Sequence, residues 1–391
     1  MSSDFAAINM KPTIFSRVIE KTLPALLFFF LAILISVDNS KLVNNFFYIC
    51  LLIPALVVLF KEKIRPTAPA FMIGIYLIYM ALSTLWGTGD LLTGMKQLKY
   101  VLYILAFAVL IHKFASPPER VALVAAGGLI TGLLLEGHSL YLQLASIGVD
   151  NWLAAFPRLE ETTGPFNPVY LALSIGLFGF ILIASKVDNP WISTVLIGAL
   201  ILVTLPLQSR TMILSLVAAH GYLMFRRRNF RVLSLWVILS LASSIALLFS
   251  IDRFTGPIYR DDIWLISLTA YLQDCSVLLG CGNRHNFGTV IDNIYFYNPH
   301  SIVLSQLLYG GVLGILFLLA TLWIINKEAR RTAEHWKPVF LYCALASLPI
   351  GHTLLTHPDF IWILIWLPLG LSGILFSPDP SPGSPGEIPA H

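Results

Sequence analysis

The sequence predicts an all-α integral membrane protein of about twelve transmembrane helices, with one large loop on its outer face. Of its 391 residues, 57% are hydrophobic and only 12% are charged, whereas soluble proteins carry roughly 25% charged residues. The mean hydropathy is +0.79. Apolar runs of the length that spans a bilayer, roughly 20 residues, recur along the whole chain. Most of the protein surface is therefore expected to face lipid.

The apolar runs give the expected helices in chain order. A polar segment with three basic residues precedes the first run, and no small-residue cleavage site follows, so the first helix is expected to be retained. The turn from Pro206 to Arg210 is so short that its two neighbouring runs could form one element or two. The expected spans are 23–37, 43–60, 68–86, 95–112, 121–148, 164–185, 190–206, 211–225, 232–251, 301–325, 338–357 and 360–377.

The placement of basic residues predicts the orientation. With both ends in the cytoplasm, most Lys and Arg residues lie in the inner loops, as the positive-inside rule requires. The chain then divides into nine helices (1–251), an outer loop (252–299), three helices (300–377) and a disordered, Pro-rich cytoplasmic tail (378–391). The net charge of +4 is small and dispersed, which argues against a nucleic-acid partner. Nucleotide-binding motifs are also absent from the sequence.

The outer loop carries a predicted amphipathic helix and two cysteines. From Tyr259 to Leu272, Ile263, Ile266, Leu268 and Leu272 are expected on one side, which would lie at the membrane interface. Cys275 and Cys281 lie in a compartment that permits disulfides, but their spacing alone leaves a bridge open. Two cysteines are too few for a zinc site, and no metal or other cofactor is expected.

Arginines on the outer side are candidates for binding a phosphorylated lipid. A guanidinium offers a planar fork of donors that matches phosphate oxygens. Alternatively, each arginine extends to lipid headgroups or pairs with a nearby aspartate. The candidates are Arg210 at the start of the eighth span, Arg260 at the start of the amphipathic helix, and Arg158 and Arg284 in the outer loops.

His300 is the candidate general base. It follows Asn298-Pro299 and opens the tenth span on the outer face, where an imidazole could take a proton from a hydroxyl near neutral pH. Gln306, a short way along the same helix, could help to orient a sugar. The alternative is a histidine with a purely structural role at the helix start.

The segment NPHSIVLSQLLYGGVLGI around His300 resembles the histidine motif of the O-antigen ligase/polymerase superfamily. In that family a Gly-x-x-Gly pair follows the histidine, here Gly311 and Gly314. The family often has Asn after the histidine, where this chain has Ser301. Three further segments resemble the family: Gly164-Pro-Phe-Asn-Pro168, which contains Asn167, Ser209-Arg210, and Arg260 to Trp264 ahead of Gly280-Cys-Gly282. The resemblance covers roughly residues 160–320.

The resemblance implies a GT-C-like, inverting and metal-independent glycosyltransferase of the bacterial inner membrane, with a periplasmic active site. Such enzymes move polysaccharide from undecaprenyl pyrophosphate to an acceptor hydroxyl, here a lipid A–core sugar. His300 would be the base, and Arg210 and Arg260 would hold the pyrophosphate. Arg158, Arg284, Gln306 and Asn167 would contact the substrates, and membrane lipids would surround the helices.

Two superfamily relatives and one other class of protein are alternatives. An O-antigen polymerase would use a second lipid-linked repeat as its acceptor. An O-linked protein oligosaccharyltransferase resembles longer chains with a larger periplasmic part at the C-terminus. A secondary transporter or flippase could also have twelve spans. However, residues 20–200 and 200–380 show no similarity to each other, and the charged candidates lie at the outer surface instead of mid-membrane.

Overall fold

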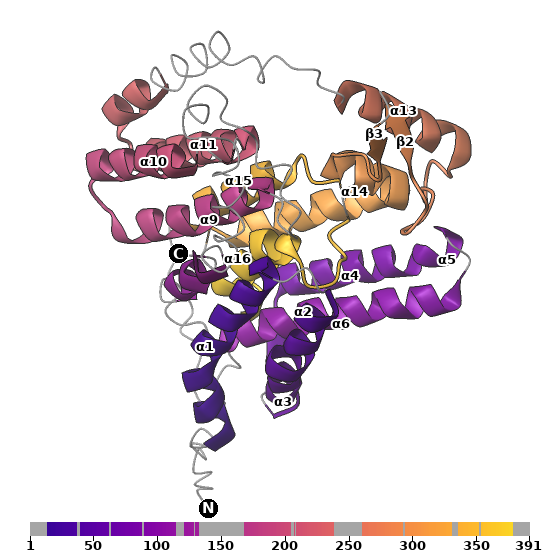
Figure 1. Cartoon of the computed structure of the whole chain (residues 1–391), viewed down its shortest axis with the longest axis horizontal. Helices are drawn as coiled ribbons and strands as arrows, with labels where there is room; N and C mark the ends of the chain where they lie inside the picture. The colour runs from indigo at the N-terminus through magenta and orange to yellow at the C-terminus, as the bar shows by residue number, and fades with distance from the viewer. Residues whose placement is uncertain are drawn as a thin grey trace, which may run out of the picture.

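The computed structural model describes residues 14–36, 40–61, 64–87, 90–114, 121–128, 130–132, 168–204, 207, 209–237, 260–291, 294–330, 335–351 and 353–377. These residues are mostly helical (Figure 1), as expected of apolar segments that must pair their backbone groups internally. Five of the described helices are long and apolar enough to cross a membrane: 41–59, 68–87, 91–112, 169–186 and 302–328.

The helices follow the predicted order of apolar runs wherever the structure describes the chain. They are α1 (Ile14–Ser36), α2 (Ser40–Phe47), the π-helical η1 (Tyr48–Leu52), α3 (Ile53–Lys61), α4 (Ala68–Leu82), α5 (Thr84–Gly87), α6 (Leu91–Phe114), α9 (Pro168–Lys186), α10 (Pro190–Thr204), α11 (Arg210–Arg226), α13 (Arg260–Asp274), α14 (Ile302–Glu328), α15 (Trp336–Ser347), the π-helical η5 (Trp362–Trp366) and α16 (Leu367–Leu371). The number twelve stays a prediction, because 133–167 and 238–259 lie outside the described residues.

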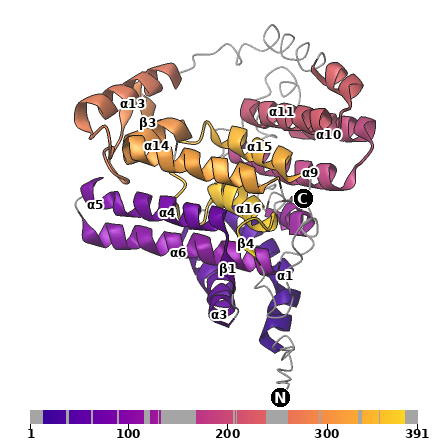
Figure 2. The same ribbon diagram turned by 180° about the vertical axis from the view of Figure 1, so that it is seen from behind.

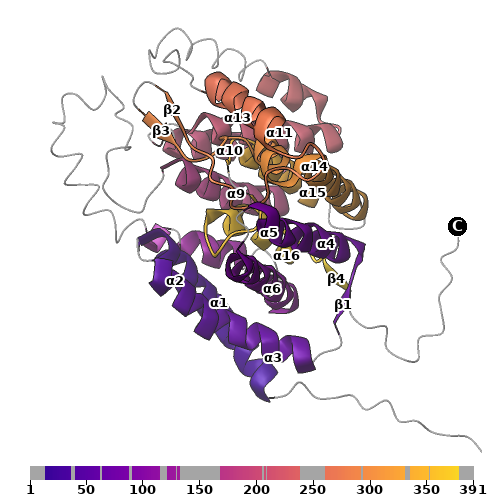
Figure 3. The ribbon, with the colours of Figure 1, turned by 90° about the vertical axis from the view of Figure 1, so that its right-hand side faces the viewer.

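Two short antiparallel strand pairs accompany these helices. β1 (Arg65–Pro66) pairs with β4 (Phe376–Ser377), and Figure 3 shows the two strands side by side at the edge of the bundle. β2 (Thr289–Ile291) pairs with β3 (Ile294–Phe296) in a hairpin that was not predicted. The hairpin and α13 lie together at one end of α14 (Figure 2). We call this end of the molecule the hairpin end.

The uncertain turn after residue 206 separates two antiparallel helices. The guanidinium of Arg227, just after α11, donates to the carbonyl of Val187 at 2.9 Å and to that of Ala184 at 3.2 Å. α11 therefore returns to the end of the molecule where α10 begins. The segment therefore forms two helices and not one continuous helix.

Contacts between distant loops agree with the predicted order of crossings. The β1–β4 pair joins the segment after the second expected span to the end of the last. At the hairpin end, the Trp86 indole donates to the Leu279 carbonyl at 3.3 Å. The twelve expected spans would put an even number of crossings between the members of each pair, and the number of spans stays a prediction.

The amphipathic helix forms as α13, but Ile263 does not lie on the same side as the other three apolar residues that were expected beside it. Ile263, Ser267 and Tyr271 are buried, and α13 packs against α14. Leu268 and Leu272, expected beside Ile263, are exposed. Residues four apart share a helix face, and the Ser267 hydroxyl can enter the interior because it bonds to the carbonyl of Ile263 at 2.6 Å. Neighbouring helices, and not hydropathy, decide which face is inside.

Aromatic side chains form the centre of the bundle. The ring of Trp362 lies 5.0 Å from Phe47 and 5.2 Å from Phe107, measured between centroids. All three side chains are buried. In lipid such van der Waals packing, and not water exclusion, drives association between helices. The cluster holds α2, α6 and η5 against one another.

The two cysteines of the outer loop, whose spacing alone left a bridge open, are joined in the structure. Cys275 and Cys281 form a disulfide, with their Cα atoms 4.5 Å apart. The bridge closes a seven-residue loop directly after α13, and we call residues 275–281 the disulfide loop. Of the two remaining cysteines, Cys343 is buried and Cys50 is half-buried.

Candidate functional site

His300 is held in an unusual backbone conformation at the start of α14. Its φ is 48°, a left-handed value that non-glycine residues rarely adopt and that costs of order 1 kcal/mol. The Asn298 side chain accepts a hydrogen bond from the His300 N–H at 3.0 Å. The imidazole is half-buried, edge-on to Phe296 at 5.7 Å. The backbone of His300 is thus held in one conformation, which sets the direction in which its side chain leaves the chain.

The segment that follows α15 holds the start of α14 in place through hydrogen bonds. The Ile302 N–H donates to the carbonyl of Leu348 at 3.0 Å, and the Ser305 hydroxyl donates to that of Gly351 at 2.5 Å. Any side chain at position 351 would collide with the Asn298 amide and the His300 backbone. A glycine is therefore required where the two segments touch.

Ser301 has a clear structural function. Its backbone is extended, and its hydroxyl accepts a hydrogen bond from the Leu304 N–H at 3.4 Å, which makes it the N-cap of α14. Serine and asparagine are both preferred N-cap residues. The serine that replaces the asparagine of the family motif can therefore perform the same capping function.

Gln306 lies deeper than a substrate contact would suggest. Its side chain is fully buried, and its carbonyl oxygen accepts a hydrogen bond from the Tyr76 hydroxyl at 2.6 Å. Its amide nitrogen has no hydrogen-bond partner among the described residues. The observed bond ties α14 to α4. A role in orienting a sugar would need access to that amide, and it stays a prediction.

The predicted phosphate-binding arginines that the structure describes lie at helix starts or in a loop. Arg210 is the first residue of α11, where Ser209 caps the helix by accepting from the Met212 N–H at 3.3 Å. Arg260 is the first residue of α13. Both side chains are exposed. α11 ends beside Val187 at the opposite end of the molecule, which places Arg210 at the same end as the start of α9.

Arg284 lies at the hairpin end, shortly after the disulfide loop. Its φ is 69° and its side chain is exposed. Arg158 and Asn167 lie outside the described residues. A meeting of His300, Arg210 and Arg260 at one substrate stays a prediction.

Asp359 is a candidate that the sequence interpretation missed. It lies in the turn before η5, and its carboxylate accepts from the Ile361 N–H at 2.9 Å. Burial raises the pKa of Asp359 to about 7, although hydrogen bonds from the Ile361 and Trp362 N–H groups act in the opposite direction. A carboxyl that titrates near neutral pH can exchange a proton during a reaction. Its position in Pro358-Asp359, between two apolar runs, was the available signal.

The raised pKa predicts a pH effect on stability. Between its unfolded pKa, about 3.9, and its folded pKa of about 7, Asp359 holds its proton more tightly when the protein is folded. Stability should therefore fall as pH rises through this window. We expect a lower Tm in detergent at pH 8 than at pH 5, and a smaller difference for Asp359→Asn, which keeps the cap. An unchanged pH difference in that variant would contradict the assignment.

The described part of the chain contains no group of three or more His, Cys, Asp or Glu side chains that could hold a metal ion.

The apolar helices of the chain and its polar groups at the helix ends together define a multi-pass helical membrane protein. The chain is similar to the O-antigen ligase of Pseudomonas aeruginosa, with 29% identity across 84% of each chain. This similarity confirms the predicted resemblance. No protein-family model matches the chain.

Proposed function

We propose that this protein is an O-antigen ligase, a membrane glycosyltransferase that moves polysaccharide from undecaprenyl pyrophosphate to a hydroxyl of a lipid A–core sugar. The similarity to a protein of that name over most of both chains carries the proposal. The proposed location is the bacterial inner membrane, with both termini cytoplasmic and the hairpin end in the periplasm. The distribution of basic residues supports this orientation.

In the proposed reaction, His300 takes the proton of the acceptor hydroxyl as its oxygen attacks the anomeric carbon. The bond from that carbon to the phosphate oxygen breaks, and undecaprenyl pyrophosphate leaves with the additional negative charge. Attack from the face opposite the leaving group inverts the anomeric configuration. The half-buried imidazole at a fixed backbone position supports the role of base.

Arg210 and Arg260 would hold the pyrophosphate and offset its growing charge. Both are exposed at the first residue of a helix, where the positive end of the helix dipole also favours an anion. Because pyrophosphate is already a good leaving group, positioning and charge stabilisation can supply most of the catalysis. This scheme requires no metal.

Deletion of the gene in its native host tests the function. Loss of a ligase should leave lipid A–core unsubstituted, while full-length polysaccharide accumulates on the carrier lipid. Glycolipid gels and extracted carrier lipid distinguish the two products. Substituted lipid A–core in the deletion strain would contradict the proposal.

The O-antigen polymerase is the second candidate, because it belongs to the same superfamily and its donor is also a lipid pyrophosphate. Its loss would leave lipid A–core carrying a single repeat. A twelve-helix transporter or flippase would instead leave the donor on the cytoplasmic face. The gel pattern and the side on which the donor accumulates separate the three functions.

A further inference from the structure

Helix α14 is broken inside its apolar sequence. At Gly311 the backbone has φ 62° and ψ −162°, whereas the residues on either side are helical. A break of this kind leaves N–H and C=O groups without partners in the helix. Within hydrocarbon each unpaired group costs several kcal/mol, so irregular backbone is found there only where protein or water supplies the partner.

The disulfide loop supplies the missing partners. Its backbone makes three hydrogen bonds across the break in α14: Cys281 N–H to Leu308 C=O at 2.7 Å, Val312 N–H to Val277 C=O at 3.1 Å, and Leu313 N–H to Leu278 C=O at 3.2 Å. The loop thus completes the broken helix from the side.

Two glycines permit this close approach. Gly280 in the loop and Gly311 in α14 both have positive φ. A Cβ at either position would overlap backbone atoms of the other segment. Replacement of either glycine would therefore separate the loop from the helix.

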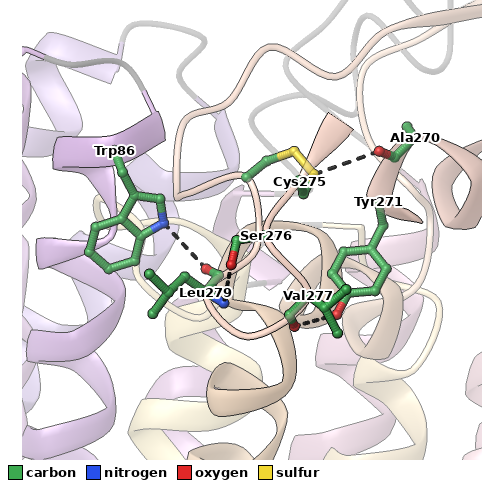
Figure 4. The surroundings of a disulfide bond; sticks show 8 residues. Trp86, Ala270, Tyr271, Cys275, Ser276, Val277 and Leu279 are labelled. Atoms are coloured by element: carbon green, nitrogen blue, oxygen red, sulfur yellow. Dashed lines mark hydrogen bonds between the residues drawn. A yellow bond between two sulfur atoms is a disulfide. The ribbon is translucent and has the colours of Figure 1, made fainter. Parts of the chain in front are cut away.

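The tip of the loop has paired carbonyls and exposed apolar side chains. The Ser276 carbonyl accepts from the Gly280 N–H at 2.7 Å, and that of Leu279 from the Trp86 indole. The Tyr271 hydroxyl gives the Val277 carbonyl a second bond at 2.5 Å (Figure 4). The side chains of Val277 and Leu278 are nevertheless 57% and 54% exposed. Paired carbonyls beside exposed apolar side chains suit hydrocarbon better than water.

The exposed tip continues the apolar surface of α14. Val312, Leu316, Leu319 and Trp323 are exposed at helical spacing, and Val312 is bonded to Val277. The stripe ends near Lys327, whose ammonium lies 5.6 Å from the Trp323 ring, a combination typical of the membrane interface. From Gly311 to Lys327 the helix is about 24 Å long, less than the hydrocarbon thickness of about 30 Å.

We propose that the disulfide loop is a re-entrant element that inserts Val277, Leu278 and Leu279 among the acyl chains of the lipid leaflet at the hairpin end. It pairs the backbone of α14 where the helix is broken and extends the lipid-facing stripe of that helix. This inference is independent of the proposed transfer reaction. It assigns to the membrane a loop that its cysteines alone would place in water.

Photocrosslinking of the full chain in proteoliposomes tests this placement. A benzophenone amino acid is introduced at position 278, at position 277 in a second variant, and at position 290 as the control. Val290, on β2, is equally apolar and 61% exposed, and we expect it to face water. The vesicles contain only phosphatidylethanolamine and phosphatidylglycerol, and mass spectrometry detects adducts. The intact Cys275–Cys281 bridge confirms that each variant is folded.

We expect phospholipid adducts at 277 and 278 at least about tenfold above those at 290. Equal adduct levels at all three positions would overturn the proposal. So would adducts that form only after undecaprenyl pyrophosphate is added, because the tip would then face the donor lipid. Crosslinks from 278 to a second copy of the chain, in place of lipid, would overturn it as well.

Discussion

His300→Ala is expected to abolish glycosyl transfer by the purified protein without lowering its expression. Removal of a general base costs about 10²–10⁴-fold in rate, so the residual rate should be close to the background. Transfer is measured with lipid-linked polysaccharide and lipid A–core in detergent. His285→Ala is the matched control, because His285 is also a half-buried histidine at the hairpin end.

The left-handed backbone at His300 calls for a second variant. His300→Asn keeps a residue type that tolerates positive φ but removes the imidazole. If the titrating ring matters, His300→Asn should be as inactive as His300→Ala while its Tm stays close to that of the wild type. An active His300→Asn would show that backbone geometry, and not the base, had been lost in the alanine variant.

Arg210→Ala is expected to lower the rate of transfer by about 10²–10³-fold, the effect of removing one charge contact from a comparable oxyanion site. The exposed side chain begins α11, and the cap is supplied by Ser209, so the fold should be unaffected. Arg210→Lys should restore only part of the rate, because an ammonium cannot form the two-pronged bond of a guanidinium.

The control for this arginine is Arg231→Ala, which removes an exposed arginine from the predicted cytoplasmic side. It should transfer at the wild-type rate. Equal losses in Arg210→Ala and Arg231→Ala would point to a general effect of charge on the membrane protein. Normal transfer by Arg210→Ala would remove Arg210 from the proposed site.

The helices of this protein could be predicted because each one needs only local information. An apolar run must become a helix in lipid, and flanking basic residues orient it. The same reasoning located α13, yet it grouped Ile263 with the exposed apolar residues, whereas Ile263 packs inside the protein. Inside a membrane protein apolar residues can face either lipid or neighbouring helices, so the burial of Ser267 depends on a partner surface that hydropathy does not describe.

The candidate site could be predicted only in part. His300 and the arginines stand out because charged or titratable residues at the ends of apolar runs are uncommon. The left-handed backbone of His300 depends on Asn298 and Gly351, which lie on segments far apart in the sequence. The shifted pKa of Asp359 likewise depends on its surroundings. The break at Gly311 requires the disulfide loop, which a single-segment interpretation cannot supply.

The β1–β4 pair has a consequence for biosynthesis. Thr67 precedes α4, and its hydroxyl donates to the carbonyl of Ile374 at 2.6 Å while its N–H donates to that of Leu375 at 3.0 Å. The entrance of α4 therefore completes its bonds only after Ile374, 307 residues further along the chain, has been synthesised. Until then the hydrogen-bonding groups of Thr67 lack these partners. The helix concerned, α4, is the one that later bonds to Gln306. Truncations near the C-terminus should thus damage an early helix first.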